Sequence, residues 1–341
     1  MQPRCSPATA NSNRVHGHAQ HRAATKTAHV QAPTATGRVR NKTRHTTQSQ
    51  EPTLRSMSPY HSFVLRFAQL LQESKSYPVG DTERPSRPGV SPDAPRVLLF
   101  SPHPDDECLA GVLPLRLLRE AGMNVLNVAV TLGSRKERRA ARLEELKRAC
   151  EYLGYGLIPT GPDGLERISP GTRVQDPAHW RSCTEAIAKI IALYQPGVIF
   201  LPHAQDWHPT HLGTHLLVMD ALNLQLSRFS CYVVETEYWC TMPTPNLLVE
   251  ANEDHVGDLV TALSFHEGEV ARNPYHVSLP ALLHDNVRRG AELVGGCGTA
   301  APDYLFGGLY RLRKWAQNQL TDVLAQGKFV PRKANLGMLF A

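Results

Sequence analysis

From Arg96 onward, short apolar runs alternate with longer stretches in which apolar residues recur at helical spacing. Each run has four to seven residues and ends near Pro, Thr or a charged residue, which is typical of buried strands. This alternation predicts a mostly parallel sheet covered by helices on both faces. The expected strands are 97–100, 125–131, 198–201, 232–237 and 247–250, and the expected helices are 108–121, 138–153, 178–194 and 209–226.

The first 56 residues have a different composition. They contain nine Lys and Arg residues but a single acid, Glu51, and almost no large aliphatic residues. Such a segment cannot bury enough apolar surface to offset its ordering entropy, so we expect it to be disordered. Its composition is similar to that of an organellar transit peptide. Alternatively, Met57 is the true start and the tail is not translated.

Residues 57–95 join this tail to the α/β pattern. Phe63, Phe67, Leu70 and Leu71 lie at helical spacing and predict a short amphipathic helix over 60–74. Five prolines within 77–95 indicate a linker. We therefore expect a catalytic domain over 96–341 that includes C-terminal helices. The helix over 60–74 could dock on this domain or mediate self-association, so a homo-oligomer stays open.

Charge and cysteine usage exclude several classes of protein. The net charge of +6 belongs to the tail, which carries +8, because the other residues have 28 basic and 30 acidic side chains. We therefore expect a small-molecule substrate and no nucleic-acid partner. The seven cysteines are scattered without a CxxC pair, which favours a reducing compartment. No apolar run approaches the ~20 residues of a membrane span, and we expect a cytoplasmic protein.

Two segments with metal-ligand chemistry follow expected strands. SPHPDDE, residues 101–107, follows the first strand, and DWHPTH, residues 206–211, follows the strand over 198–201. Two histidines and a carboxylate suit catalytic zinc, and a second carboxylate can accept a proton from water at the metal. Either segment alone is often a turn or a helix cap. Together, at the carboxyl ends of parallel strands, they favour one shared metal site.

These motifs resemble those of the LmbE/PIG-L family. SPHPDDE is similar to the family's [A/S]HPDDE signature, and HPTH at 208–211 is similar to its HPDH segment. RLEELKRACEYLG at 142–154 and PNLLVE at 245–250 resemble a family helix and strand, so the resemblance covers about 96–270. It implies a Rossmann-like three-layer α/β/α fold. It also implies a zinc-dependent hydrolase that removes acetyl groups from N-acetylglucosamine-type amines.

Residue roles are implied by motif position. The resemblance implies one Zn²⁺ per chain with His103, Asp106 and His211 as its ligands. It implies that Asp105 is the general base, and that His208 stabilises the oxyanion or protonates the leaving amine. These are the three functions that amide hydrolysis needs. Iron or cobalt would fit the same ligands.

The sequence departs from the family pattern at two places. Thr210 replaces the second acid of HPDH, so a carboxylate that orients the histidine must come from elsewhere, and Asp206 is our candidate. The usual T-x-G-E stretch reads TLGSRK at 131–136. An acidic sugar contact is therefore absent, and the basic loop in its place, which includes Arg135, indicates an anionic substituent such as a phosphate or carboxylate on the substrate, unless these side chains are simply solvated. Arg142 is a further candidate for contact with substrate or ligands.

Other polar residues have two interpretations. Glu107 either favours the positive end of a helix or supports the site from behind, and His215 either packs behind the site or replaces His211 as a ligand. Trp239 and Tyr238 form either a sugar platform or part of the core. The polar residues of 266–276 either rim the pocket or lie on a solvated helix.

Three functions follow from these residues. The leading hypothesis is a zinc N-deacetylase acting on an amino-sugar conjugate. The alternatives are a zinc amidase with a non-sugar N-acyl substrate and a catalytically silent metal-binding scaffold. Asp105 argues against the scaffold, because a structural site needs no spare carboxylate.

Overall fold

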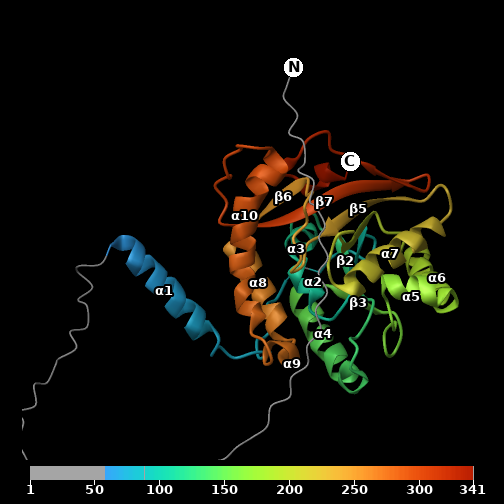
Figure 1. The fold of residues 1–341 in the computed structure, drawn as a ribbon, viewed down its shortest axis with the longest axis horizontal. Helices are drawn as coiled ribbons and strands as arrows, with labels where there is room; N and C mark the ends of the chain where they lie inside the picture. The colour runs from blue at the N-terminus through green and yellow to red at the C-terminus, as the bar shows by residue number, and fades with distance from the viewer. Residues whose placement is uncertain (1–57, 88, 341) are drawn as a thin grey trace, which may run out of the picture. The chain divides into compact units, whose positions relative to one another are not determined.

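The computed structural model describes residues 58–87 and 89–340, so the predictions for residues 1–56 lie outside the described part. Nine strands form one sheet in the order β3-β2-β1-β4-β5-β7-β6-β9, with β8 paired to β7 (Figure 1). Their bounds are β1 Arg96–Ser101, β2 Asn124–Ala129, β3 Gly156–Pro159, β4 Val198–Pro202, β5 Ser230–Thr236, β6 Leu247–Ala251, β7 Phe306–Ala316, β8 Gln319–Asp322 and β9 Lys328–Val330.

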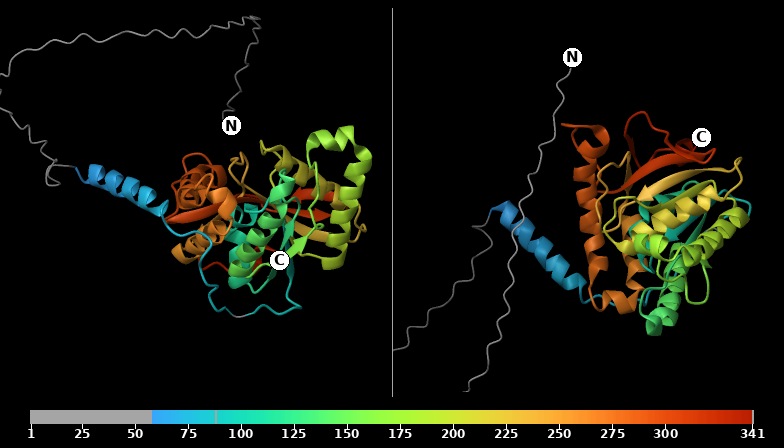
Figure 2. Two further views of the ribbon diagram at one scale, coloured as in Figure 1. Left: turned by 90° about the horizontal axis from the view of Figure 1, so that it is seen from below. Right: turned by 45° about the vertical axis from the view of Figure 1, so that its right-hand side comes forward.

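Helices cover both faces of this sheet (Figures 1 and 2). The longer ones are α3 Val112–Arg119, α4 Arg139–Leu153, α6 Pro177–Tyr194, α7 Pro209–Asn223, α8 Glu253–Ser264 and α10 Leu279–Gly295. The short ones are α2 Asp106–Leu109, α5 Pro170–Gln175 and α9 Glu267–Val270, with 3₁₀ turns η2 Lys136–Arg138, η3 Tyr275–Ser278 and η4 Leu336–Leu339. The mostly parallel α/β/α architecture predicted from the sequence is confirmed.

The apolar residues of β1 contribute to two hydrophobic cores, one on each face of the sheet. Side chains alternate between faces along a strand, and Val97 and Leu99 pack with residues of α3, α4 and α8, whereas Leu98 and Phe100 pack with α6 and α7. All four are fully buried. The run is therefore continuously apolar because the strand has no solvent face.

Strands β3, β7, β8 and β9 were not predicted from the sequence. Strands β3, β2, β1, β4 and β5 are parallel, but β7 runs antiparallel to β5 and β6. The expected C-terminal helices are α8, α9 and α10, and the chain then returns through β7, β8 and β9. The expected helix over 108–121 is two helices, α2 and α3, separated at Ala110 and Gly111.

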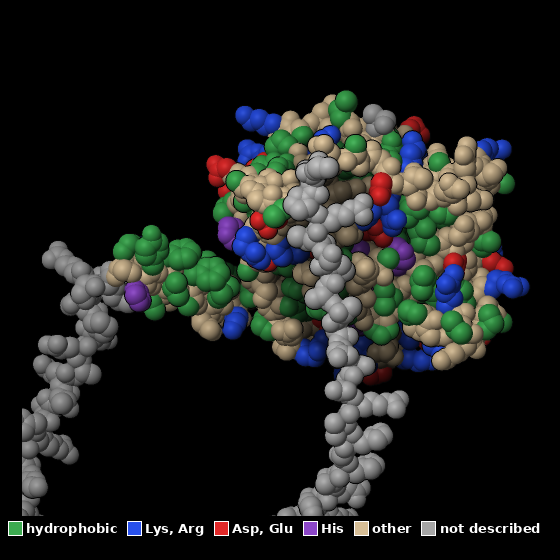
Figure 3. All heavy atoms as spheres, turned by 45° about the horizontal axis from the view of Figure 1, so that its top comes forward, with side chains coloured by type: hydrophobic (Ala, Val, Ile, Leu, Met, Phe, Trp, Pro, Cys, Tyr) green, Lys and Arg blue, Asp and Glu red, His purple; other side chains and the backbone are tan. Residues whose placement is uncertain are grey.

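Helix α1, Pro59–Ser74, agrees with the predicted amphipathic helix. Ser58 caps it, since its hydroxyl accepts a hydrogen bond from the N–H of His61. None of its residues is buried, and Phe63 is 65% exposed. Hydrophobic side chains cover much of its visible surface (Figure 3). Within the described residues, no helix combines the length and apolarity needed to cross a bilayer.

A buried arginine ties the C-terminal segment to the core. The side chain of Arg116 on α3 is fully buried, and its guanidinium pairs with Glu120 at 2.7 Å. Nη1 donates to the carbonyl oxygen of Glu250 at 3.0 Å, and Nη2 donates to that of Arg332 at 2.9 Å. One cation therefore satisfies carbonyl groups from β6 and from the segment after β9, both remote in sequence.

We predict that Arg116→Met lowers the free energy of unfolding by about 2–4 kcal/mol, because it leaves buried carbonyl groups without donors. The matched control is Arg288→Met on α10, where the side chain is 73% exposed, and the change should stay within about 0.5 kcal/mol. Urea denaturation measures both. Equal stability of the two variants would show that the buried guanidinium contributes nothing.

Candidate metal centre

The two metal-ligand segments meet at the point where the strand order of the parallel sheet reverses. Strands β2 and β3 follow β1 on one side, and β4 and β5 lie on the other. Because β1 and β4 are parallel neighbours, their carboxyl ends open into the same crevice, where ligands of such sheets bind. The segment after β1, up to the start of α2, carries His103, Asp105 and Asp106, and the segment after β4, up to the first turn of α7, carries Asp206, His208 and His211.

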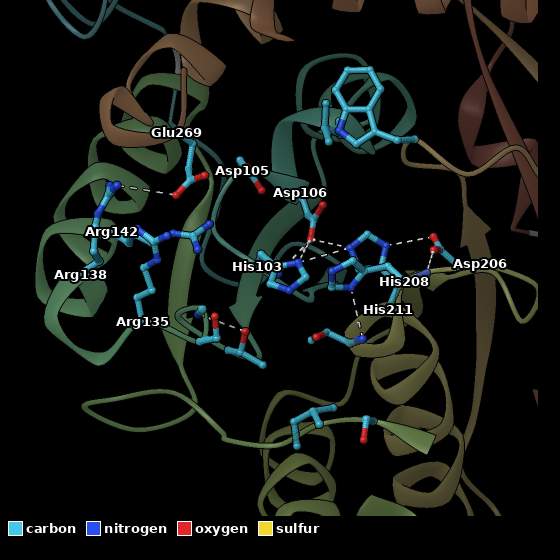
Figure 4. Close-up of a pocket in the computed structure, with 18 of the residues that line it drawn as sticks. His103, Asp105, Asp106, Arg135, Arg138, Arg142, Asp206, His208, His211 and Glu269 are labelled. Carbon is cyan, nitrogen blue, oxygen red and sulfur yellow. Dashed lines mark hydrogen bonds and ion pairs between the residues drawn. The ribbon is translucent and has the colours of Figure 1, made fainter. Parts of the chain in front are cut away.

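Three donor atoms from these segments form a small triangle. His103 Nδ1 lies 3.3 Å from Asp106 Oδ2 and 3.3 Å from His211 Nε2. The third edge, from His211 Nε2 to Asp106 Oδ2, is 3.4 Å. Figure 4 shows the carboxylate of Asp106 above the imidazoles, which point toward one another.

This triangle fits a zinc ion. Zinc–nitrogen and zinc–oxygen bonds are about 2.0–2.2 Å, so a tetrahedral arrangement separates neighbouring donors by about 3.3–3.6 Å. All three measured edges fall in that range. His103, His211 and His208 also lie within 4.8 Å of one another by their nitrogen atoms. The donor atoms of His103, Asp106 and His211 lie closer together than the 4.8 Å limit that the three histidines meet. The exposed His208 therefore lies beside the triangle and is not one of its members.

The electrostatics of the triangle favour a shared positive charge. Burial opposes ionisation of Asp106, yet the charges and hydrogen bonds of His211 and His103 hold the pKa of its carboxyl well below the usual range. Burial likewise disfavours the charged form of His211, but Asp106 and Asp206 outweigh it and raise the pKa of this imidazole to about 10. A divalent cation would displace that proton and supply the same charge.

Asp206 orients His211. Its Oδ2 lies 2.9 Å from His211 Nδ1, and its Oδ1 accepts a hydrogen bond from the backbone N–H of His208 at 2.7 Å. The carboxylate thereby fixes the ring so that Nε2 faces His103 and Asp106. Metal-binding imidazoles commonly have such a partner. The carboxylate expected in place of the family's acid at Thr210 is therefore present at the position proposed from the sequence.

Asp105 lies beside the triangle in an unusual backbone conformation. Its φ of 112° is left-handed, which costs a non-glycine residue of the order of 1–3 kcal/mol. Its N–H donates to Glu107 Oε2 at 2.9 Å, and its Oδ2 accepts a hydrogen bond from the hydroxyl of Tyr275 at 2.5 Å. Burial, reinforced by Asp106, raises the pKa of this carboxyl to about 6. The carboxylate of Asp105 thus contacts Tyr275, whereas the carboxylate of Asp106 contacts the imidazoles of His103 and His211.

Glu107 supports this turn from beneath. Its side chain is fully buried, and Oε1 lies 2.7 Å from Nε2 of the equally buried His266. Burial opposes the charged imidazole, but Glu107 raises the pKa of His266. Of the two interpretations of Glu107, the structure places it behind the site. The solvated-helix interpretation is wrong for His266, whereas Glu269 and Arg272 do line the pocket.

His208 has a defined tautomer. It caps α7, because its Nδ1 accepts a hydrogen bond from the N–H of Thr210 at 3.3 Å. The neutral ring therefore carries its proton on Nε2, which is left as a donor. Burial, with the charges of His103 and His211, lowers the pKa of this ring. Its ring lies edge-on to that of His103 at 4.9 Å.

Other candidate residues lie behind or around the centre. His215 Nδ1 lies 2.8 Å from the carbonyl oxygen of Pro202, so this histidine packs behind the site. Tyr238 is buried and packs edge-on against His211 at 4.7 Å, whereas Trp239 lines the pocket and packs against Tyr275. Arg135 and Arg142 also line this pocket, which has a volume of about 1230 Å³.

Sequence reasoning missed Tyr275 and the pairing of His266. Tyr275 lies in η3, 170 residues from Asp105, and no motif or spacing marks it. Trp207, at 70% exposure, also lines the pocket without having been singled out. Tyr275 and His266 are found only once the segment after α8 is seen to contact Asp105 and Glu107, which follow β1.

Comparison with known proteins agrees with the motifs. Residues 98–222 match the family model described as PIG-L, GlcNAc-PI de-N-acetylase. A diacetylchitobiose deacetylase from Thermococcus kodakarensis is 26% identical over 143 residues, which are 38% of this chain and 50% of the relative. The chain thus matches about half the length of that curated protein.

Solved structures with a similar fold include an N,N'-diacetylchitobiose deacetylase from Pyrococcus horikoshii, at 19% identity and a TM-score of 0.47, with 73% of this chain and 92% of that chain covered. They also include a 4-carboxy-2-hydroxymuconate hydratase from Pseudomonas putida, at 16% identity and a TM-score of 0.47, with 64% and 95% covered.

We predict that Asp206→Asn weakens zinc binding about 10–100-fold, because it removes the charge that orients His211. The matched control is Asp163→Asn, at an exposed aspartate for which the structure gives no hydrogen bond or ion pair, and its zinc affinity should equal that of the wild type. Competition with a chromogenic chelator measures both. Unchanged affinity in Asp206→Asn would contradict this role.

Proposed function

We propose that this chain, which belongs to the PIG-L (LmbE-like) family, is a zinc-dependent N-deacetylase of N-acetylated amino sugars. The observation that carries the proposal is the donor triangle of His103, Asp106 and His211, with the uncoordinated Asp105 beside it. A site of this composition has separate groups to hold a cation and to accept a proton. Its similarity to a diacetylchitobiose deacetylase supports an amino-sugar substrate.

In this proposal His103, Asp106 and His211 hold one zinc ion per chain. When bound, the ion lowers the pKa of water to about 7 and polarises the amide carbonyl. Asp206 keeps the Nε2 atom of His211 turned toward the ion, since its carboxylate fixes the other ring nitrogen. The ligands come from two loops, so the ion also links the carboxyl ends of β1 and β4.

Asp105 is the proposed general base. It accepts a proton from the attacking water while the water oxygen bonds to the amide carbon. Tyr275 donates to Oδ2 of this carboxylate, so the hydrogen bond fixes the side chain and leaves Oδ1 for the water. The hydrogen bond from the backbone N–H of Asp105 to Glu107 holds the left-handed turn. In this turn Asp105 can face the pocket, while Asp106 faces the two histidine ligands.

His208 is the proposed donor to the substrate. The hydrogen bond from Thr210 to Nδ1 leaves the proton on Nε2, where it can stabilise negative charge on the amide oxygen. Cleavage of the carbon–nitrogen bond then requires a proton on the leaving amine, which Asp105 or His208 returns. The products are a carboxylate and a free amine. Proton transfer thus begins and ends on residues of this chain.

We predict that Asp105→Asn retains zinc but lowers kcat about 10²-fold or more, because the amide cannot accept the proton. Asp106→Asn is the matched variant and should lose zinc. Metal content by elemental analysis and acetate release by a coupled assay measure the two effects. Loss of zinc from Asp105→Asn, with retention in Asp106→Asn, would mean that the two aspartates have exchanged roles.

Removal of metal supplies an independent prediction. Treatment with a chelator should abolish acetate release from an N-acetylated amino sugar, and added Zn²⁺ should restore it. Because ligand binding stabilises the folded state, Zn²⁺ should also raise the Tm of the wild type but not of His211→Ala. Activity that survives complete removal of divalent metals would contradict the proposed chemistry.

A further inference from the structure

The pocket is strongly basic on one side. Figure 4 shows Arg135, Arg138 and Arg142 together, across the imidazoles from Asp206. Outside the metal centre, seven basic residues but only two acids line the pocket; the basic residues are Arg135, Lys136, Arg138, Arg139, Arg142, Arg167 and Arg272, and the acids are Glu166 and Glu269. This side of the pocket is therefore built to favour negative charge.

Five of the seven cations have a carboxylate partner. Lys136 and Arg139 share Glu166, Arg138 and Arg272 pair with Glu269, and Arg167 pairs with Asp176. Within residues 58–87 and 89–340, Arg135 and Arg142 have no such partner. The side chain of Arg135 makes no hydrogen bond or ion pair with any of those residues, and only its backbone carbonyl oxygen is engaged, by the N–H of Arg138. These two guanidinium groups are left to bind a ligand.

Arg142 makes no direct ion pair within the described residues, although its charge also acts on the nearby carboxylates of Asp105 and Glu269. Its Nη2 donates to the carbonyl oxygen of Pro104 at 3.0 Å, which fixes it against the loop between His103 and Asp105. Its Nε is buried and has no partner among the described residues. An unpaired buried donor costs of the order of 1–3 kcal/mol. An anion would supply the missing acceptor.

The loop between β2 and η2 leaves room for this guanidinium. Gly133 has a φ of 89°, and a Cβ at this position would collide with Nη1 of Arg142. The left-handed backbone therefore favours glycine at this position, and a larger residue would also displace the guanidinium of Arg142. Arg135 follows two residues later, at the carboxyl end of β2, next to the crevice that holds the metal centre.

We infer that Arg135 and Arg142 form a binding site for an anionic substituent, a phosphate or a carboxylate, on the substrate. Guanidinium groups match both anions through paired, charge-assisted hydrogen bonds. A neutral sugar hydroxyl would gain less binding free energy, because it carries no charge and because guanidinium groups have no acceptor for its proton. This inference rests on the proposed function and narrows its substrate class to an acidic N-acetylated amino sugar.

The test compares acetate release from neutral N-acetylglucosamine with that from its 1-phosphate and 6-phosphate and from N-acetylmuramic acid. For the wild type, kcat/KM should be about tenfold or more higher with at least one anionic sugar. Arg135→Gln should remove that advantage with little effect on the neutral sugar, and Arg142→Lys should reduce it. The phosphate and carboxylate arms identify the group that is recognised.

Arg167→Gln is the matched control, because Arg167 lines the same pocket but is paired with Asp176 at 3.0 Å. It should keep the preference for the anionic sugar. The inference is overturned if the neutral sugar is used as well as every anionic one. It is equally overturned if Arg135→Gln lowers neutral and anionic turnover alike, or if Arg167→Gln removes the preference as fully as Arg135→Gln.

A binding measurement separates this inference from the proposed function. Metal-free protein should bind glucosamine 6-phosphate about tenfold or more tightly than glucosamine in calorimetry, and the difference should shrink in Arg135→Gln and at high salt. If no sugar releases acetate, the proposed function fails, and this measurement still decides the anion site. Equal affinity for the two amines would then reject the site.

Discussion

The approach of His103, Asp106 and His211 to within 3.3–3.4 Å is the interaction on which the rest of the site depends. A carboxylate and two imidazoles this close in a largely dry place are stable only when they share a positive charge. Asp106 is 3% exposed, so bulk water cannot solvate its charge. The switch point between β1 and β4 supplies the frame, because it brings two loops about a hundred residues apart to one crevice.

Residues around the triangle restrict what its members can do. Asp206 holds one nitrogen of His211, and Thr210 holds one nitrogen of His208, so each ring presents its other nitrogen to the centre. The hydrogen bond from the hydroxyl of Tyr275 likewise fixes the orientation of the Asp105 carboxylate. The buried pair of Glu107 and His266 supports the strained turn beneath it. Each of these contacts removes an alternative orientation, and preorganisation of this kind is what catalytic geometry requires.

How much of this arrangement the sequence could predict depends on how far apart in the sequence the residues of each contact lie. The strands β1 and β4 are predictable because they are apolar on both faces, and the paired motifs are predictable because they are local. Tyr275 and His266 act on Asp105 and Glu107 across more than 150 residues, and no local pattern encodes such a contact. The antiparallel β7 was missed because the partly exposed Arg311, Arg313 and Lys314 do not resemble a buried strand.

The donor triangle and the loop at 131–136 differ in how strictly the structure determines their residues. A change in the triangle alters three mutually dependent distances, whereas the loop at 131–136 contacts the segment that carries His103 through the hydrogen bond from the Thr131 hydroxyl to the carbonyl oxygen of Pro102. Arg135 gives that loop a positive charge without replacing a residue of the triangle. The loop needs only Gly133 to keep its left-handed turn and the space for the guanidinium of Arg142. In the proposed function, the chemistry is therefore assigned to the carboxyl ends of the strands at the switch point, and recognition of an anionic substituent to Arg135 and Arg142.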